Sequence, residues 1–332
     1  MVAPTPSVEA GDGSAAVVIQ PNKELRLDMT FTASHLSLRL RFPKCGWILV
    51  YGSMLILAMR GVALSAALEL YETGAPDLGT ASAGRAAMAA DASTAASNPA
   101  GLTLLDGTQL MFSAGALLPM TNFDVGPRTT TRGGGGGNAG VFFPLGSSFL
   151  AYKWSERIWL GVGVYSDFGL SANYGNSWAG RYYANRESLI TTKVNPSIAY
   201  ALNKWIAVGA GFSFAVARLT FKSQINNLLS GAGDGSMSFE SWDEAFGGNA
   251  GILVTPLAKL RIGLTYQSPE FFKFGFRPFF KNLGPDLALI GKRIGGIQVN
   301  IPVEQPQQVM ASAVYEVLPR WSLMGNIGWQ NW

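Results

Sequence analysis

The 332-residue sequence is short of charge: 14% of its residues are Asp, Glu, Lys or Arg, against about 25% in soluble domains. The net charge is only +4, and the Lys and Arg residues are scattered, which argues against a nucleic-acid partner. Glycine, by contrast, is abundant, with 40 residues, and aromatic residues make up 11%. This combination favours β-strands with one apolar face and one small or polar face.

Cysteine and histidine are each present once, as Cys45 and His35. Both precede the segment in which we expect the mature chain to begin. A mature chain without them has no disulfide, no thiol nucleophile, no histidine-based triad and no Cys or His metal site. The acidic residues Asp234, Asp243 and Glu244 do not form a metal-binding pattern. We therefore expect neither an enzyme nor a cofactor or metal.

Residues 39–67 have the three parts of a secretory signal peptide, namely a basic start, an apolar run at 45–59 and small residues at its end. The apolar run is shorter than the ~20 residues that a membrane-spanning helix needs. We expect cleavage within 65–67 and take 1–67 as an N-terminal extension plus signal peptide. A single N-terminal membrane anchor is the alternative.

From residue 108 onward the chain alternates apolar and small residues. In WIAVGAGFSFAVA, 205–217, the bulky apolar residues fall on one face and Ala, Gly and Ser on the other, and LRIGLTYQ, 260–267, repeats the pattern. Side chains alternate between the two faces of a strand, so each strand has one apolar face. Tryptophans stand at expected strand ends, where an interfacial girdle would place them: Trp154, Trp159, Trp205 and Trp321.

Short turns alternate with long glycine-rich or polar stretches between these strands. Turns at 155–157 and 203–204 are short, whereas 124–138, 171–188 and 281–296 are long. Short turns at one end and long loops at the other are typical of an outer-membrane barrel, which must close because lipid cannot satisfy an open sheet edge. The sequence therefore predicts an all-β transmembrane antiparallel β-barrel, with outer-membrane lipid around it. A soluble β-sandwich or barrel is the alternative.

The segment RAAMAADASTAASNPAGL, 85–102, is rich in Ala and small polar residues and precedes the first strand. It is too weakly apolar for a membrane helix, and its side chains are too small for an ordinary core. A wide barrel leaves a lumen that a plug can fill. We therefore divide the remaining chain into a plug, 68–107, and barrel strands, 108–332.

The segment GRAAMAADASTAASNPAGLTLLDGTQLMFSAGALLP, 84–119, resembles the plug and first strand of the FadL family of outer-membrane transporters for long-chain fatty acids and other hydrophobic compounds. The resemblance continues in YSDFGLSANYGNSWAGRYYA, 165–184, in VNPSIAYALNKWIAVGAGFSFAVARLTF, 194–221, and in the closing WSLMGNIGWQNW. It covers nearly everything after residue 68.

This resemblance implies a plugged fourteen-stranded barrel in the outer membrane of a Gram-negative bacterium. It implies passive uptake of a hydrophobic ligand, most readily a long-chain fatty acid, and sideways release at a kinked third strand near Phe168 and Gly169. We expect a monomer. The sequence shows only about nine strands, so we read the chain as incomplete at its C-terminus; a true nine-stranded relative is the alternative.

The resemblance identifies Asn98, Pro99 and Ala100 as the plug motif, with a gate role or a purely structural one. A cation could hold a carboxylate head group, and the candidates are Arg181, Arg218 and Lys222, or all three are solvated. Fatty-acid carriers of the family place a basic residue at about the position of Ser223. Its absence leaves aromatic or aliphatic hydrocarbons open as the ligand.

The run FFKFGFRPFF supplies a candidate hydrophobic capture patch, with ordinary girdle and strand packing as the alternative: Phe271, Phe272, Phe274 and Phe276. Two other function classes remain, an outer-membrane hydrolase and a structural, receptor or adhesion barrel. The missing histidine argues against the hydrolase, and the plug motif argues against the adhesin.

Overall fold

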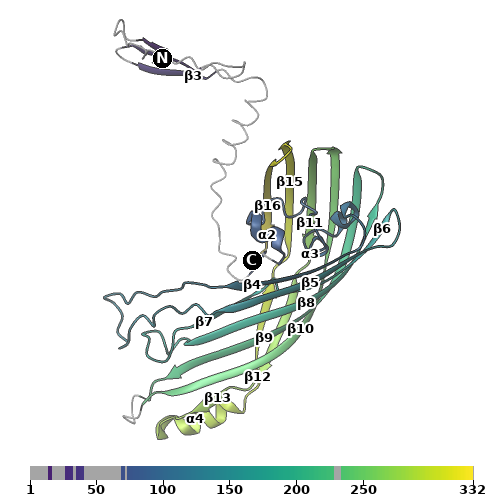
Figure 1. Ribbon diagram of the computed structural model, residues 1–332. Coiled ribbons are helices and arrows are strands. Elements are labelled where there is room, and N and C mark those ends of the chain that lie inside the picture. The colour runs from purple at the N-terminus through teal and green to yellow at the C-terminus, as the bar shows by residue number, and fades with distance from the viewer. Residues whose placement is uncertain are drawn as a thin grey trace, which may run out of the picture. The chain divides into compact units, whose positions relative to one another are not determined.

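The computed structural model describes residues 14–16, 27–32, 35–40, 69–71, 73–227 and 233–331 (Figure 1). It separates into two compact units, Met1–Ser65 and Ala66–Trp332. The first contains three antiparallel strands in the order β1-β2-β3: β1 Ser14–Ala16, β2 Leu27–Thr32 and β3 His35–Leu40. The apolar run and the cleavage site of the expected signal peptide lie outside the described residues. Within the described part of the chain, no helix has the length and apolar character to cross a membrane.

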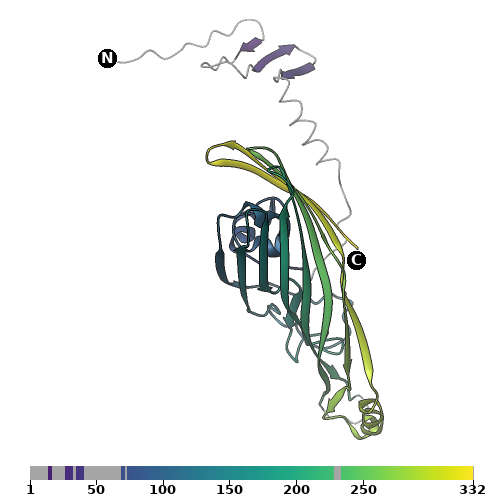
Figure 2. The same ribbon diagram turned by 90° about the vertical axis from the view of Figure 1, so that its right-hand side faces the viewer.

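The second unit is built on one antiparallel sheet that curls around short helices (Figures 1 and 2). Its path of nine strands runs β4-β5-β6-β8-β9-β10-β11-β15-β16, while β7 pairs with β8, β13 pairs with β10, and β12 and β14 form a separate ribbon. The edge strands β4 and β16 do not pair with each other, so the described sheet is open. The predicted all-β antiparallel class is confirmed.

The strands of this unit are β4 Gln109–Leu117, β5 Phe143–Lys153, β6 Ile158–Tyr165, β7 Gly169–Asn173, β8 Arg186–Ala201, β9 Ile206–Ile225, β10 Gly235–Leu257, β11 Leu260–Gln267, β12 Glu270–Phe276, β13 Phe279–Lys281, β14 Val299–Gln305, β15 Gln308–Leu318 and β16 Trp321–Gln330. Its helices are α2 Ala75–Thr80, α3 Thr94–Ser97, the 3-10 helix η1 Pro99–Leu104 and α4 Pro285–Gly295.

Side-chain burial along β9 is the reverse of that in a soluble sheet. The small residues Ala207, Ser213 and Ala215 are buried, whereas the bulky Phe212 is 53% exposed. In β11, Ile262 is exposed in the same way. The predicted alternation is confirmed, and it places the apolar side chains on the convex face and the small ones on the concave face. Such a sheet is suited to lipid outside and to packed polypeptide inside.

The two ends of the sheet differ. Residues 154–157, 202–205 and 319–320 make tight connections at one end, where Trp154 N donates to Ile158 O over 3.0 Å. At the other end long connections include 118–142 and 277–298, the second of which carries β13 and α4. The predicted contrast between short turns and long loops is therefore present.

The expected tryptophan girdle is correct for three of its four members. Trp154, Trp205 and Trp321 are more than half exposed at the short-turn end. Trp159 is different: it is 5% exposed and belongs to the core that includes plug residue Leu102. It faces inward because its position in β6 has the same parity as the buried Tyr165.

The plug lies against the concave face, and strand glycines allow its backbone to come close. A Cβ atom at Gly209 would overlap Ala100 N, one at Gly251 would overlap the Asn98 side chain, and one at Gly263 would overlap Ala86 O. These glycines lie on three different strands, so the contact surface extends across the sheet. The high glycine content therefore has a packing cause, because any larger side chain would push the plug away.

Replacing one of these glycines should loosen the plug. We expect Gly251→Ala to lower the free energy of unfolding by roughly 1–3 kcal/mol, as overpacked sites do. Gly146→Ala on β5 is the control, because a Cβ atom there meets nothing within 4 Å. Urea unfolding in lipid vesicles measures both variants, and equal midpoints would contradict close plug packing at Gly251.

Candidate functional site

A break interrupts the sheet between β6 and β7, which both pair with β8. Tyr165 lies opposite Lys193. Gly169 lies opposite Ile190. Three residues, 166–168, therefore face only two on β8, which is a bulge. Gly169 has φ +156°, a conformation that strongly favours glycine.

Residues 69–71, the extended segment at the start of the plug, lie against this break. Leu70 N donates to Asp167 O over 2.7 Å, and Glu69 forms an isolated antiparallel bridge with Phe168. Phe168 itself is fully buried. The backbone of the segment therefore contacts the backbone of the bulge. Displacing the segment would expose the break.

Lys193 is the centre of a buried charged cluster beside the break. Its side chain is 2% exposed, and Nζ lies 2.9 Å from Asp167 Oδ2 and 3.1 Å from Glu270 Oε2. It also donates to Gln305 Oε1 over 3.4 Å, and Ser213 Oγ donates to Glu270 Oε1 over 2.6 Å. These residues come from the break and from β8, β9, β12 and β14. The cluster therefore crosslinks strands that are not neighbours in the sheet.

The charge of this cluster is not balanced. One ammonium group faces two carboxylates, those of Asp167 and Glu270. Asp167 Oδ1 and Gln305 Nε2 are buried without a hydrogen-bond partner among the described residues. Because buried charge of one sign repels like charge at low dielectric, the inner surface at the break is unfavourable for an anionic head group.

Glu69 adds a fourth ionisable group. Its carboxylate accepts a hydrogen bond from Gln308 Nε2 at 2.6 Å and another from Gln330 Nε2. Burial, followed by repulsion from Asp167, raises the pKa of Glu69 from 4.5 to about 7, and Arg85 opposes this shift. The anchor of the extended segment to β15 and β16 therefore changes charge near neutral pH.

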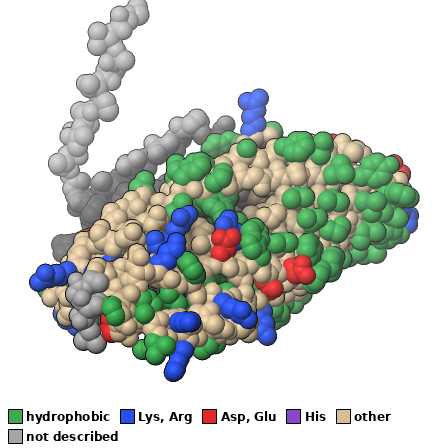
Figure 3. Space-filling model, turned by 90° about the horizontal axis from the view of Figure 1, so that it is seen from below, with side chains coloured by type: hydrophobic (Ala, Val, Ile, Leu, Met, Phe, Trp, Pro, Cys, Tyr) green, Lys and Arg blue, Asp and Glu red, His purple; other side chains and the backbone are tan. Residues whose placement is uncertain are grey.

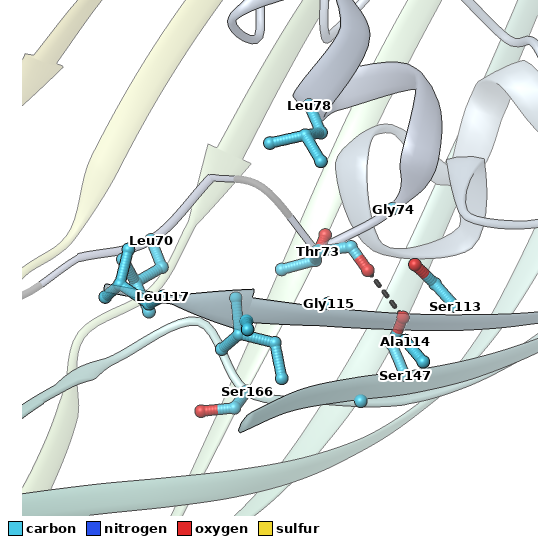
Figure 4. Close-up of a pocket in the computed structure, with 13 residues that line it drawn as sticks. Leu70, Thr73, Gly74, Leu78, Ser113, Ala114, Gly115, Leu117, Ser147 and Ser166 are labelled. Atoms are coloured by element: carbon cyan, nitrogen blue, oxygen red, sulfur yellow. Dashed lines mark hydrogen bonds between the residues drawn. The ribbon is translucent and has the colours of Figure 1, made fainter. Parts of the chain in front are cut away.

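An apolar cavity of about 360 Å³ lies next to the segment and the break (Figure 4). Leu70, Leu117 and Leu145 supply apolar wall, while Ser147 and Ser166 supply hydroxyl groups, and no charged residue lines it. Leu70 also borders the smaller space that Glu69 and Arg85 line. A hydrophobic molecule in the cavity would therefore touch the same segment that covers the break.

The plug motif lies at the contact between plug and sheet. Asn98 is 1% exposed, and its Nδ2 donates to Ala86 O over 2.6 Å and to Ile252 O of β10 over 3.3 Å. Its Oδ1 accepts from Ala100 N at 3.0 Å and so caps η1, in which Pro99 is the first residue. The motif thus fixes the fold of the plug and its attachment at once.

None of the three head-group candidates lines the cavity. Arg181 Nε donates to Asp234 over 2.7 Å, which ties two loops together. Arg218 forms a two-pronged pair with Glu240, with both distances 2.9 Å, on the outward face. Lys222 lies on the same strand as Arg218 and has the same parity, so it too points outward. The structure does not bring these cations together.

The phenylalanine run does not form one exposed patch. Phe271 is 64% exposed, but Phe272, Phe274 and Phe276 are 8% exposed or less. The alternation of β12 points the other three toward the concave face of β9 and β10, where Phe272 and Phe274 pack with Phe168 and Ala245, and points Phe271 away from it. The idea of a single capture patch from these four residues is corrected accordingly.

Sequence reasoning missed Glu69, Asp167, Lys193 and Glu270. A signal was present for one of them: in TKVNPSIAY the outward positions are Val194 and Ile198, so Lys193 has inward parity. A lysine on the inner face of a membrane strand needs a buried partner. The partners could not be named, because they lie 26 and 77 positions away in the chain.

Comparisons with known proteins agree with this architecture. Residues 56–332 match the family described as outer membrane protein transport protein (OMPP1/FadL/TodX). The chain belongs to this family. Its members are outer-membrane transport proteins for hydrophobic compounds, and the predicted outer-membrane location is confirmed.

Individual relatives are distant. The chain is 26% identical over 300 residues to the long-chain fatty acid transport protein of Escherichia coli O6:H1, covering 81% of this chain and 67% of that protein. It is 27% identical over 181 residues to outer membrane protein P1 of Haemophilus influenzae, covering 49% of this chain and 39% of that one. A Pseudomonas aeruginosa FadL homologue has a similar fold, with TM-score 0.67 and 19% identity over 80% of this chain and 70% of its own.

Removing the buried ammonium group should destabilise the sheet. Lys193→Met leaves two carboxylates buried without a counter-charge, and we expect a loss of roughly 3–5 kcal/mol. The triple variant with Asp167→Asn and Glu270→Gln should recover most of it. Lys204→Met, at an exposed turn, is the control. Urea unfolding in vesicles tests this; a triple variant no more stable than Lys193→Met would contradict the charge argument.

The attachment of the extended segment should depend on pH through Glu69. Its pKa is higher in the folded protein, about 7 against 4.5, so the folded state binds more protons between these values. Stability therefore rises as the pH falls from about 7 to 4.5, by up to ~3 kcal/mol. Hydrogen exchange of the Leu70 amide, corrected for the intrinsic rate, should show this rise, and Glu69→Gln should abolish it. Equal pH profiles for both proteins would refute the assignment.

Proposed function

We propose that this protein lets hydrophobic small molecules cross the outer membrane passively, with long-chain fatty acids as the first substrate class. The observation that carries the proposal is the uncharged cavity beside the strand break, covered by a segment that contacts both. The names of the Escherichia coli relatives support the substrate class, at 25–26% identity over 81% of the chain.

The proposed route runs from the long loops to the break. Phe272 and Phe274 are buried against Phe168, so the packed apolar cluster they form connects β12 to the break along this route. A ligand in the cavity presses on Leu70. The hydrogen bond from Leu70 N to Asp167 O holds the segment at the bulge. When that hydrogen bond breaks, the segment moves away and opens the break in the sheet. Gly169 permits the backbone bend there, and the ligand leaves sideways into the membrane.

In this proposal Asn98, Pro99 and Ala100 keep the plug in register with the sheet. Asn98 bonds to Ile252 O, and the backbone of Pro99 and Ala100 lies against Gly209. A plug that is held here but free at its N-terminal segment can open the break without leaving the lumen. That division gives the motif a gate role in addition to its structural one.

A second candidate is uptake of neutral aromatic or aliphatic hydrocarbons. No charged residue lines the cavity, and the cluster at the break has an excess of carboxylates. Arg181 and Arg218 are already paired with acids. A hydrocarbon needs no cation, whereas a fatty acid carboxylate does. The solved toluene transporter TbuX of Ralstonia pickettii shares the fold, with TM-score 0.54 and 19% identity over 71% of this chain and 66% of its own.

Uptake in a strain without its own fatty-acid transporter tests both candidates. Cells that express the chain should take up labelled oleate or labelled toluene, and Asn98→Ala should reduce the uptake. Gly115→Phe should also reduce it by filling the cavity, while Leu110→Phe on the outward face of the same strand should not. The ligand taken up decides between the candidates. Uptake of neither by folded protein would favour a structural or receptor barrel.

A further inference from the structure

Two cations stand directly opposite each other on the outward face. Arg186 of β8 pairs in register with Lys222 of β9, and residues paired in this way point to the same side of the sheet. Like charges in that position repel and destabilise the pair. Neither forms an ion pair with any residue in the described ranges. An anion between the two groups would relieve this repulsion.

The cationic surface continues across the neighbouring strands. Lys222 lies opposite Ser238 of β10, which lies opposite Phe279 of β13. At about 4.8 Å per strand, Phe279 is roughly 10 Å from Lys222. Phe279 is 57% exposed, and Lys281, two positions on, lies 5.4 Å from its ring. Lys281 also has no acidic partner among the described side chains.

The ribbon of β12 and β14 does not extend this surface. Its buried side chains Phe272 and Phe274 pack with Ala215 and Ala245, which face the concave side of the sheet. The exposed Phe271 and Lys273 therefore belong to the concave side, and the convex surface consists of Arg186, Lys222, Phe279 and Lys281.

The depth of these cations corresponds to the lipid head groups. Trp205 marks the short-turn end, and Trp242, opposite Arg218, marks the other. The twelve residues 206–217 between them span roughly 30 Å at ~3.3 Å per residue and ~40° tilt, close to the thickness of the hydrocarbon layer. Lys222 lies four residues beyond Arg218 on β9, and Arg186 lies opposite it. Figure 3 shows apolar side chains covering the right of the view and Lys and Arg side chains gathering toward the left.

We propose that this surface binds a phosphorylated glycolipid of the outer leaflet. Its phosphate groups lie between Arg186 and Lys222 and beside Lys281, and an acyl chain lies along Phe279. Lys and Arg are suited to phosphate, and basic groups at membrane depth favour anionic lipid. This inference rests on the outer-membrane location and does not depend on the transported substrate.

Binding of purified lipid A to the full chain in zwitterionic nanodiscs tests the proposal. At roughly fivefold per cation, the double variant Arg186→Gln/Lys222→Gln should weaken binding about 30-fold. The control Arg157→Gln/Lys204→Gln removes two exposed cations from the short-turn end and should leave binding unchanged. Equal affinities for the two double variants would overturn the proposal, as would equal binding of dephosphorylated lipid A.

A second measurement holds even if the variant folds less well. Without lipid A, Arg186→Gln should raise the melting temperature, because it removes the repulsion from Lys222. With saturating lipid A the same substitution should lower the melting temperature relative to the unchanged chain. A shift of the same sign in both conditions would refute the anion between these groups. Competition by the transported ligand alone would instead identify the surface as a capture site for that ligand.

Discussion

The buried ammonium group of Lys193 connects the parts on which the site depends. It joins the break, through Asp167, to β12, through Glu270, and to β14, through Gln305. A buried charge must be paired, so these three elements cannot move apart without leaving it uncompensated. The extended segment is attached to the same place, since Leu70 N bonds to Asp167 O. The curl of the sheet, the geometry of the break and the position of the plug are therefore coupled.

The second constraint is that the concave face must accept polypeptide and the convex face lipid. Small residues such as Ala207 and Gly209 are inside because the plug backbone reaches them. Bulky residues such as Phe212 and Ile262 are outside because lipid is as apolar as they are. This sorting explains how a chain with little charge and much glycine still forms a well-packed interior, in which the plug and the sheet share the core.

The strands and the plug could be predicted because each depends on local pattern. Alternation over 205–217 determines which face is apolar, and the small polar residues before 108 favour a plug. Predicting that Trp159 points inward, and that the phenylalanine run divides between two faces, requires the exact strand register. A shift of one residue in the register exchanges the two faces. The charged cluster could not be predicted, since Asp167, Lys193 and Glu270 meet only when the sheet curls.

The cations inside the sheet and those outside it have different partners, and this difference affects which ligands the protein can transport. Inside, Lys193 is matched by more carboxylates than it can neutralise. Outside, Arg186 and Lys222 face water or lipid head groups and are matched by no acid among the described residues. An anionic molecule is thus attracted at the rim and repelled at the break. A hydrocarbon experiences neither effect. A fatty acid must carry its carboxylate from the attractive rim to the repulsive break. The two candidate substrates therefore differ chiefly in the free energy needed to pass the break.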